Sequence, residues 1–395
     1  MKERPLLMIP GPVEFEPSVL SALGQPTQSH IDPQFIGVFE GAIKKMREVW
    51  HSPSGQPFIV PGTGTLAMEI PAANLVEPED RVLVVSTGYF GDRYADILSR
   101  YTNKVTVLSA PLGGIVETAH IEAELKKSEY RLMTITHVDT STGVRVDPRP
   151  IGKLGHKYGV LTVLDGVCSV AGEELKQDAW ELDVVFTASQ KAVGVPPGLA
   201  LVLAGPRAVN RWRKRKSRVP NYYCDWNQWL PVMEAYEAGT PAYFATPAVN
   251  HVRALDVSLD NILKEGMEER FQRHRVVGKA FQAGLEALGL KQVPLNKKDR
   301  AFTLSAPYYP AGVTGDRLLP QIRRAGVVFA GGLHPEIKKN YFRIGHMGST
   351  CFRDVLASLG ALEAALRDCG VSVNPGVSLT AAQSVIVSEN SETAV

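Results

Sequence analysis

The chain has 395 residues, of which 44% are hydrophobic and 21% are charged, as is typical of a globular protein and not of a disordered or fibrous one. Its 43 Lys and Arg residues nearly balance its 41 Asp and Glu residues, and a net charge of +2 provides no field that would attract nucleic acid or a membrane surface. The sequence contains no run of 18 apolar residues, so we expect neither a transmembrane helix nor a membrane partner.

The N-terminal part of the chain predicts an extended arm followed by a helix. Prolines recur within residues 1–20 and disfavour regular structure there. From Phe35 to Trp50, apolar side chains recur at helical spacing and would pack onto a core or a partner. Short apolar runs then alternate with helical segments, at 81–86, 104–108, 131–137, 159–165, 183–189 and 199–204. This alternation predicts an α/β domain with a mostly parallel sheet that is covered on both faces.

The C-terminal part of the chain predicts a second, smaller domain. A helical stretch over 249–288 leads into a new series of short strands and helices, which ends in an amphipathic helix near Asp368. We therefore expect an arm over 1–20, a large domain over 21–262, a small α/β domain over 263–372 and a poorly ordered tail over 373–395.

Polar, aromatic or glycine-rich residues follow the strands of the predicted parallel sheet. In open parallel sheets, binding sites form just beyond the carboxyl ends of the strands. The segments at those ends are PGTGT at 61–65, TGYFG at 87–91, VDTSTG at 138–143, DGVCS at 165–169 and ASQK at 188–191. We expect these segments to converge on one site.

The glycine-rich segment Gly62-Thr-Gly64 has two interpretations. It is either an ordinary strand-to-helix turn or a helix start whose free N–H groups cradle a phosphate. A nicotinamide site is disfavoured, because Asp80 precedes the next strand where the dinucleotide fingerprint needs an acid at its end. The sequence also lacks the P-loop pattern of nucleoside triphosphate sites.

Three further residues combine with this cradle. Lys191 lies among small and apolar residues in TASQKAVGVPPG, where burial would disfavour its ammonium form and free the amine as a nucleophile; the alternative is a surface lysine. Asp165 is either a helix cap or a carboxylate that faces a cation. Phe90 is either a core residue or a plate for a flat ring. A lysine, an aspartate, an aromatic plate and a phosphate cradle together are what pyridoxal phosphate needs.

At these residues the sequence resembles the alanine–glyoxylate and serine–pyruvate aminotransferases, within the class V pyridoxal-phosphate enzymes, and the fungal members most of all. The resemblance runs from residue 6 to about 368 and is carried by SQKAVGVPPG, THVDTSTGV, TGYFGDR, YFATP and RIGHMG. It implies the aspartate aminotransferase-like fold (fold type I), with a mostly parallel sheet in a large domain and a smaller C-terminal α/β domain.

The resemblance also implies a role for each site residue. Lys191 would be the Schiff-base lysine and Asp165 the partner of the pyridine nitrogen, and these two are the predicted catalytic residues. The predicted cofactor-binding residues are Thr63, Gly64, Thr65, Phe90, Ser141, Asp165, Val167, Gln190, Lys191, Tyr243 and Thr246. The substrate would contact Gly11, Ser141 and Arg343, whose forked guanidinium suits an α-carboxylate; a buried salt bridge is the alternative for Arg343. Tyr243 and Thr246 would reach the cofactor of the other subunit, which implies a homodimer with its active sites at the interface.

The implied reaction moves an amino group from L-alanine, or from L-serine, to glyoxylate, and gives pyruvate and glycine. Phe90 stands where animal members have Trp and Thr65 where some have His, which leaves the donor open. A lyase of the same superfamily, such as a cysteine desulfurase, would need a mobile catalytic cysteine, for which Cys351 is the candidate. A nucleic-acid or scaffold module would use the basic run at 211–218, which otherwise predicts a solvated helix face or a positive rim.

The four cysteines are far apart and show no metal-ligand spacing, so we expect reduced thiols and no metal. His30, His137 and His346 also lack such spacing, and structural or supporting roles are predicted for them. The first residues lack the apolar segment of a signal peptide. We therefore expect a cytoplasmic protein, with a mitochondrial or peroxisomal location as the alternative.

Overall fold

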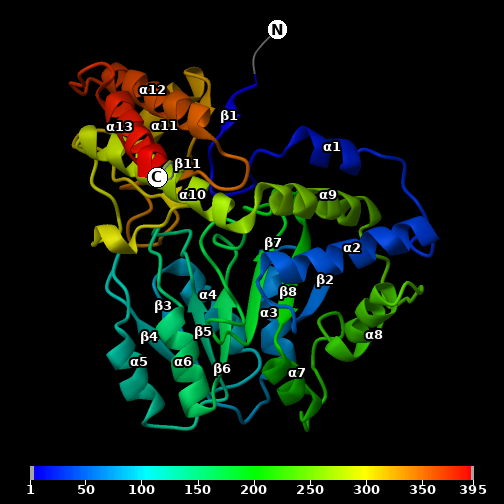
Figure 1. Ribbon diagram of the computed structural model, residues 1–395. Coiled ribbons are helices and arrows are strands. Elements are labelled where there is room, and N and C mark those ends of the chain that lie inside the picture. The colour runs from blue at the N-terminus through cyan, green and yellow to red at the C-terminus, as the bar shows by residue number, and fades with distance from the viewer. Residues whose placement is uncertain (1–3, 393–395) are drawn as a thin grey trace.

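The computed structural model describes residues 4–392 of the chain, and its centre is a seven-stranded sheet (Figure 1). The strand order is β2-β8-β7-β6-β5-β3-β4, and only β8 runs against its neighbours β2 and β7, so the prediction of a mostly parallel sheet is confirmed. The bounds are β2 (Gln56–Gly62), β3 (Val82–Ser86), β4 (Val105–Ser109), β5 (Leu132–Thr136), β6 (Leu161–Asp165), β7 (Val184–Ala188) and β8 (Gly198–Ala204).

Helices pack around this sheet because its inner strands are apolar on both faces. Every residue of β3, β5, β6 and β7 is buried. Helix α3 packs on β7 and β8, α4 on β3 and β5, and α6 on β6. The helices around the sheet are α2 (Pro33–Val49), α3 (Gly64–Leu75), α4 (Tyr89–Leu98), α5 (Thr118–Leu125), α6 (Arg149–Tyr158), α7 (Pro206–Arg213), α8 (Trp226–Glu237) and α9 (Val249–Glu265).

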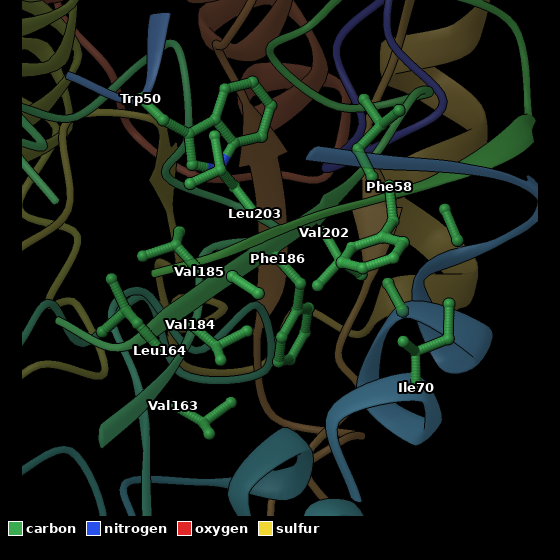
Figure 2. Packing of buried hydrophobic residues seen from close by; sticks show 14 of the residues in the cluster. Trp50, Phe58, Ile70, Val163, Leu164, Val184, Val185, Phe186, Val202 and Leu203 are labelled. Carbon is green, nitrogen blue, oxygen red and sulfur yellow. The ribbon is translucent and has the colours of Figure 1, made fainter. Parts of the chain in front are cut away.

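Figure 2 shows how side chains of β6, β7 and β8 fill the core beside the sheet, with Phe186 between β-branched neighbours. Phe58 of β2 stacks on Trp226 of α8, with ring centroids 4.9 Å apart and planes 5° from parallel. Each such side chain contributes about 1.5–3 kcal/mol by leaving water. This core holds the carboxyl ends of the parallel strands in a fixed register.

The predicted helical stretch over 249–288 is two helices. Helix α9 ends at Glu265 and α10 (Met267–Ala287) begins at once, because Gly266 between them has φ +90°. A side chain is strained at that φ, and a Cβ on Gly266 would also lie 2.1 Å from the Glu269 carboxylate. The glycine therefore turns the chain between the two helices.

A second hydrophobic cluster lies in the C-terminal part of the chain, at the top of Figure 1. A three-stranded sheet of order β11-β12-β9 lies with this part, and the N-terminal strand β1 pairs in parallel with β10. The bounds are β1 (Leu6–Leu7), α1 (Pro17–Leu23), β9 (Leu304–Ser305), α11 (Gly315–Arg324), β10 (Val327–Val328), β11 (Ala330–Gly331), β12 (Phe342–Gly345) and α12 (Phe352–Asp368). The domain limits at 20, 262 and 372 stay predictions.

The expectation of a poorly ordered tail is wrong for most of its length. Residues Val377–Glu392 form α13, which packs on α10 and α12. The Glu363 carboxylate anchors its start by accepting hydrogen bonds from the Gly376 N–H at 2.7 Å and the Ser378 N–H at 2.8 Å. These tertiary contacts order the segment, although its sequence has no apolar period at helical spacing. Residues 393–395 lie outside the described part.

Membrane-spanning helices and clusters of metal-ligating side chains are both absent from the described residues. Between residues 4 and 392, no helix combines the length and the apolar character needed to cross a bilayer. In that same range, no group of three or more His, Cys, Asp or Glu side chains is placed to hold a metal ion.

Candidate active site

Lys191 lies in a closed turn that follows β7. The Ser189 hydroxyl closes the turn by donating to the Pro196 carbonyl at 2.8 Å and accepting from the Leu199 N–H at 3.2 Å. The Lys191 side chain is only 9% exposed, and its Nζ donates to the carbonyl of Pro10. No carboxylate of the described residues lies within 4.0 Å of this Nζ, so the amine is buried without a counter-ion. The alternative of a surface lysine is thereby excluded.

Gly11 passes directly over the Lys191 side chain. Its φ of +93° strains any residue with a Cβ, and a Cβ there would lie 2.6 Å from Lys191 Cδ and 2.9 Å from Nζ. Only glycine fits this close approach. The structure thus brings Gly11, predicted to contact substrate, against the predicted catalytic lysine.

Asp165 ends β6 and is 3% exposed. Burial raises the pKa of its carboxyl to about 7; a hydrogen bond from the Val167 N–H at 2.9 Å opposes this shift, and the nearby carboxyl of Asp139 adds to it. A cation placed beside such a group restores its ionised form. Asp165 is therefore suited to face a positively charged ligand atom.

A cavity of about 170 Å³ joins Asp165 to Lys191. Its lining contains eight predicted site residues together with Met68 and Arg93, which the sequence did not indicate: Thr63, Gly64, Thr65, Phe90, Asp165, Val167, Gln190 and Lys191 are the eight. Larger cavities lie elsewhere, at about 350 and 800 Å³, but neither contains a buried lysine facing a carboxyl of raised pKa. The small cavity is therefore the candidate active site because of the residues that line it, although larger cavities exist.

The start of α3 forms one wall of this cavity. Gly64 is the first helical residue, and the side chain of Thr63, the residue before it, makes no capping hydrogen bond. The first N–H groups of a helix have no partner within the helix and favour an anion. Gln190 also lines the cavity, and its amide oxygen is buried without a hydrogen-bond partner among the described residues. The N–H groups at the start of α3 can donate to an anionic group such as a phosphate.

Phe90 and Ser141 are held by a buried carboxylate that sequence reasoning did not single out. Asp139 accepts hydrogen bonds from the Ser141 N–H at 2.8 Å, the Ser141 hydroxyl at 2.6 Å and the Phe90 N–H at 3.1 Å. The Arg93 guanidinium lies 5.1 Å from the centre of the Phe90 ring. Ser141 itself does not line the cavity. Asp139 is part of the motif THVDTSTGV, but the motif does not reveal its hydrogen bond with Phe90, because Phe90 follows a different strand.

Arg343 on β12 has no carboxylate of the described residues within 4.0 Å, so the buried salt bridge is excluded. Its Nε donates to the Gly331 carbonyl at 2.9 Å and its Nη1 to the Thr140 carbonyl at 3.3 Å. Thr140 in turn contacts Cys168, three residues after Asp165, through a 2.7 Å hydrogen bond between their side chains. A half-buried cation without a counter-ion favours an anionic ligand.

Tyr243 and Thr246 do not line the cavity. Both are exposed and lie between α8 and α9; the Tyr243 side chain is 66% exposed, and its ring centroid is 5.5 Å from that of His30. Their predicted contact with a second subunit remains a prediction.

The basic run at 211–218 is partly structural. Arg215 donates to the carbonyls of Asn74 at 3.2 Å and Val76 at 2.7 Å, and the Glu77 carboxylate accepts from the Lys216 and Ser217 N–H groups.

His137 and His346 are both buried, and burial lowers the pKa of each imidazole to about 3. His346 also bonds Ser305 and the Phe302 carbonyl, which agrees with a structural role.

Comparison with known proteins identifies the family. The family model "Aminotransferase class-V" matches residues 18–334, which is most of the chain. The chain belongs to the class V aminotransferases. This aminotransferase is 38% identical over 361 residues to "Alanine--glyoxylate aminotransferase 1" of Saccharomyces cerevisiae, covering 87% of this chain and 92% of the yeast protein. It is 29% identical to "Serine--glyoxylate aminotransferase" of Arabidopsis thaliana, covering 96% of this chain and 94% of that protein.

A solved structure agrees with this assignment. The alanine–glyoxylate aminotransferase of Nostoc sp. superposes with a TM-score of 0.87 at 32% identity, over 93% of this chain and 96% of the Nostoc chain. The enzyme is therefore a pyridoxal-phosphate-dependent aminotransferase that acts on amino acids and oxo acids. The same matches favour transamination over the lyase alternative. Cys351, the candidate for a lyase, lies at the N-cap of α12.

The cavity of this aminotransferase fits pyridoxal phosphate. The start of α3 offers free N–H groups to a phosphate, and Phe90, Asp165 and Lys191 line the same cavity. The amide oxygen of Gln190, which has no partner among the described residues, offers a hydrogen-bond acceptor to a donor group of a ligand. The residue types that line the cavity agree with the cofactor of the family.

Proposed function

We propose that this aminotransferase moves the amino group of L-alanine, with L-serine as the alternative donor, to glyoxylate, and so forms pyruvate and glycine. The observation that carries the proposal is the buried Lys191, which lines the same cavity as Asp165, together with the counter-ion-free Arg343, which bonds the Thr140 carbonyl. The names of the yeast and Nostoc relatives support alanine as donor, and the name of the Arabidopsis relative supports serine. All three names contain glyoxylate, which supports it as the acceptor.

When bound, pyridoxal phosphate supplies a carbonyl group that takes up the amino group and a ring that accepts electron density from the substrate. Thr63, Gly64, Thr65 and Gln190 would hold its phosphate, and Phe90 would stack on its ring beside Val167. Asp165 would keep a proton on the ring nitrogen, because a buried carboxylate stabilises a cation beside it.

Lys191 Nζ would move the proton that leaves the α-carbon of the amino acid. Among the described residues only the Pro10 carbonyl bonds this nitrogen, and because the nitrogen donates in that hydrogen bond, the lone pair of the neutral amine stays available to act as a base. Arg343 would bind the α-carboxylate of donor and acceptor alike through its fork of N–H groups, beside Gly11 and Ser141. The guanidinium fixes the α-carbon relative to the amine, which converts proton transfer into a step between groups already in place.

The proposed enzyme is a homodimer. Tyr243 and Thr246 are exposed polar residues outside the cavity of their own chain, which supports a role toward the cavity of a partner. Light scattering coupled to gel filtration is expected to give the mass of two chains. A cofactor-bound monomer with full activity would contradict this arrangement.

We propose that the enzyme takes part in glyoxylate metabolism and glycine formation, and that it is located in the cytoplasm. All four cysteines are free, and three of them are buried, which suits a reducing compartment.

Half-reaction spectroscopy tests the proposed donor. The visible absorption of the holoenzyme is recorded while L-alanine, L-serine, L-aspartate and L-glutamate are added separately. We expect alanine to abolish the absorption at the lowest concentration, serine to follow, and glyoxylate to restore it. Absorption that responds to aspartate or glutamate but not to alanine would overturn the proposed donor.

A further inference from the structure

The hydroxyl of Tyr341 connects two segments that flank the carboxylate-binding arginine. It donates to the Ser141 carbonyl and accepts from the N–H groups of Leu333 at 2.8 Å and His334 at 2.9 Å. A phenolic hydroxyl has one donor and two acceptor positions, so all of its hydrogen-bonding capacity is used. The side chain is completely buried.

Arg343 ties the same two segments together. Its guanidinium donates to Thr140, the neighbour of Ser141, and to Gly331, two residues before Leu333. Tyr341 and Arg343 are two positions apart along an extended chain, and side chains at that spacing point to the same face. The hydroxyl and the guanidinium thus form two adjacent links between one loop of the large sheet and one segment of the C-terminal sheet.

The links set the position of the guanidinium. Three of the five N–H groups of Arg343 have no acceptor in the described structure, and the two that have one bond backbone carbonyls whose segments Tyr341 holds. If the two segments move apart, these carbonyls move with them, and the three N–H groups of Arg343 that have no acceptor change direction. The same movement displaces Ser141, whose carbonyl accepts from Tyr341 and whose hydroxyl bonds Asp139.

We propose that Tyr341 is a positioning residue for the substrate carboxylate. By joining Ser141 to the 333–334 segment, its hydroxyl fixes the direction in which Arg343 presents its fork, and so sets the affinity for every α-carboxylate that enters. The inference rests on the carboxylate-binding role proposed for Arg343. It extends the site to a residue that does not touch the cavity around Lys191.

The test is Tyr341→Phe in the holoenzyme, with propionate as a probe. Propionate is alanine without its amino group, so its binding reports the carboxylate site without any reaction. The variant removes the hydrogen-bond partner of two N–H groups, of Leu333 and His334, and of the Ser141 carbonyl, and we expect propionate affinity to fall on the order of 10-fold. The KM values for alanine and glyoxylate should rise together by a similar factor, with kcat within about threefold and cofactor affinity unchanged.

Tyr308→Phe is the matched control. Tyr308 pairs with Tyr341 across an antiparallel bridge, and their ring centroids are 6.4 Å apart. Its hydroxyl has no hydrogen bond in the structure, so its removal should leave propionate affinity and both KM values unchanged. If Tyr341→Phe does not fold, Tyr341→His retains a hydrogen-bonding ring and is measured instead, with a smaller loss of propionate affinity expected.

Arg343→Gln separates the positioning role of Tyr341 from the carboxylate-binding role of Arg343. Propionate affinity that falls in Arg343→Gln but stays at the wild-type value in both Tyr341 variants overturns the positioning role alone. Propionate affinity that is unchanged in Arg343→Gln overturns the proposed role of Arg343. A loss of cofactor affinity in Tyr341→Phe equal to the loss of propionate affinity would show a general loosening of the fold and would also overturn the positioning role.

Discussion

Replacing Asp165 by Asn should stabilise the cofactor-free protein and at the same time lower the activity of the loaded enzyme by about 100-fold or more. Asn fills the same volume and can still accept the hydrogen bond from the Val167 N–H, now 2.9 Å long. The substitution removes only the charge, which burial opposes: in the folded chain the pKa of this carboxyl rises from 3.8 to about 7. Ionising Asp165 therefore costs free energy only in the folded state.

The size of the effect depends on pH in a defined way. Above pH 7 the folded state bears the full cost, which is about 3 pKa units at about 1.4 kcal/mol each, or about 4 kcal/mol. At pH 5 the unfolded chain is ionised and the folded one is protonated, so the cost is about 1.5 kcal/mol. Asp165→Asn should thus raise the free energy of unfolding by up to about 4 kcal/mol at pH 8 and by less than half of that at pH 5.

The assay is urea unfolding of the cofactor-free protein at pH 5 and pH 8, followed by tryptophan fluorescence at one protein concentration. Asp96→Asn, which removes an exposed carboxylate of α4, controls for the loss of one negative charge. The pyridoxal-phosphate-loaded Asp165→Asn enzyme should lose activity by about 100-fold or more, as expected when one preorganised charge is removed from a buried site. Equal stabilisation at both pH values, or none at pH 8, would refute the reasoning.

Three further substitutions test the geometry of the site and its support. Gly11→Ala should abolish transamination, because its Cβ would lie 2.6 Å from Lys191 Cδ, and circular dichroism should show the fold retained. Asp139→Ala frees the backbone of Phe90 and the side chain of Ser141, so we expect cofactor affinity, measured by fluorescence titration, to fall on the order of 10-fold. Phe186→Ala removes a fully buried ring from the main core, and should lower the free energy of unfolding by about 3–5 kcal/mol in urea titrations while leaving the KM values unchanged.

The sequence was sufficient to predict the sheet and the residues at its carboxyl ends. Apolar runs such as LTVLD predicted strands that the structure confirms to within a few residues, because burial on both faces demands continuous apolar side chains. Lys191, Asp165 and Phe90 converge because parallel strands deliver their ends to one edge. Arg343 was found by resemblance, since it comes from a different sheet.

What the sequence did not reveal depends on contacts between distant segments. Arg93, a partly buried residue of α4, lines the cavity, and Asp139 and Tyr341 act on residues that are far away along the chain. The break at Gly266 could have been predicted, because a glycine inside a helical pattern is a known stop signal. Helix α13 has no apolar period, and its order comes from Glu363 and from packing on α10.

The most direct test of the proposed function follows the nitrogen atom. Purified holoenzyme is incubated with glyoxylate and L-alanine isotopically labelled at nitrogen, and the products are analysed by mass spectrometry. Amino transfer predicts labelled glycine and unlabelled pyruvate in equal amounts, and Lys191→Ala should form neither. Label released as ammonia, or glycine without label, would contradict the account.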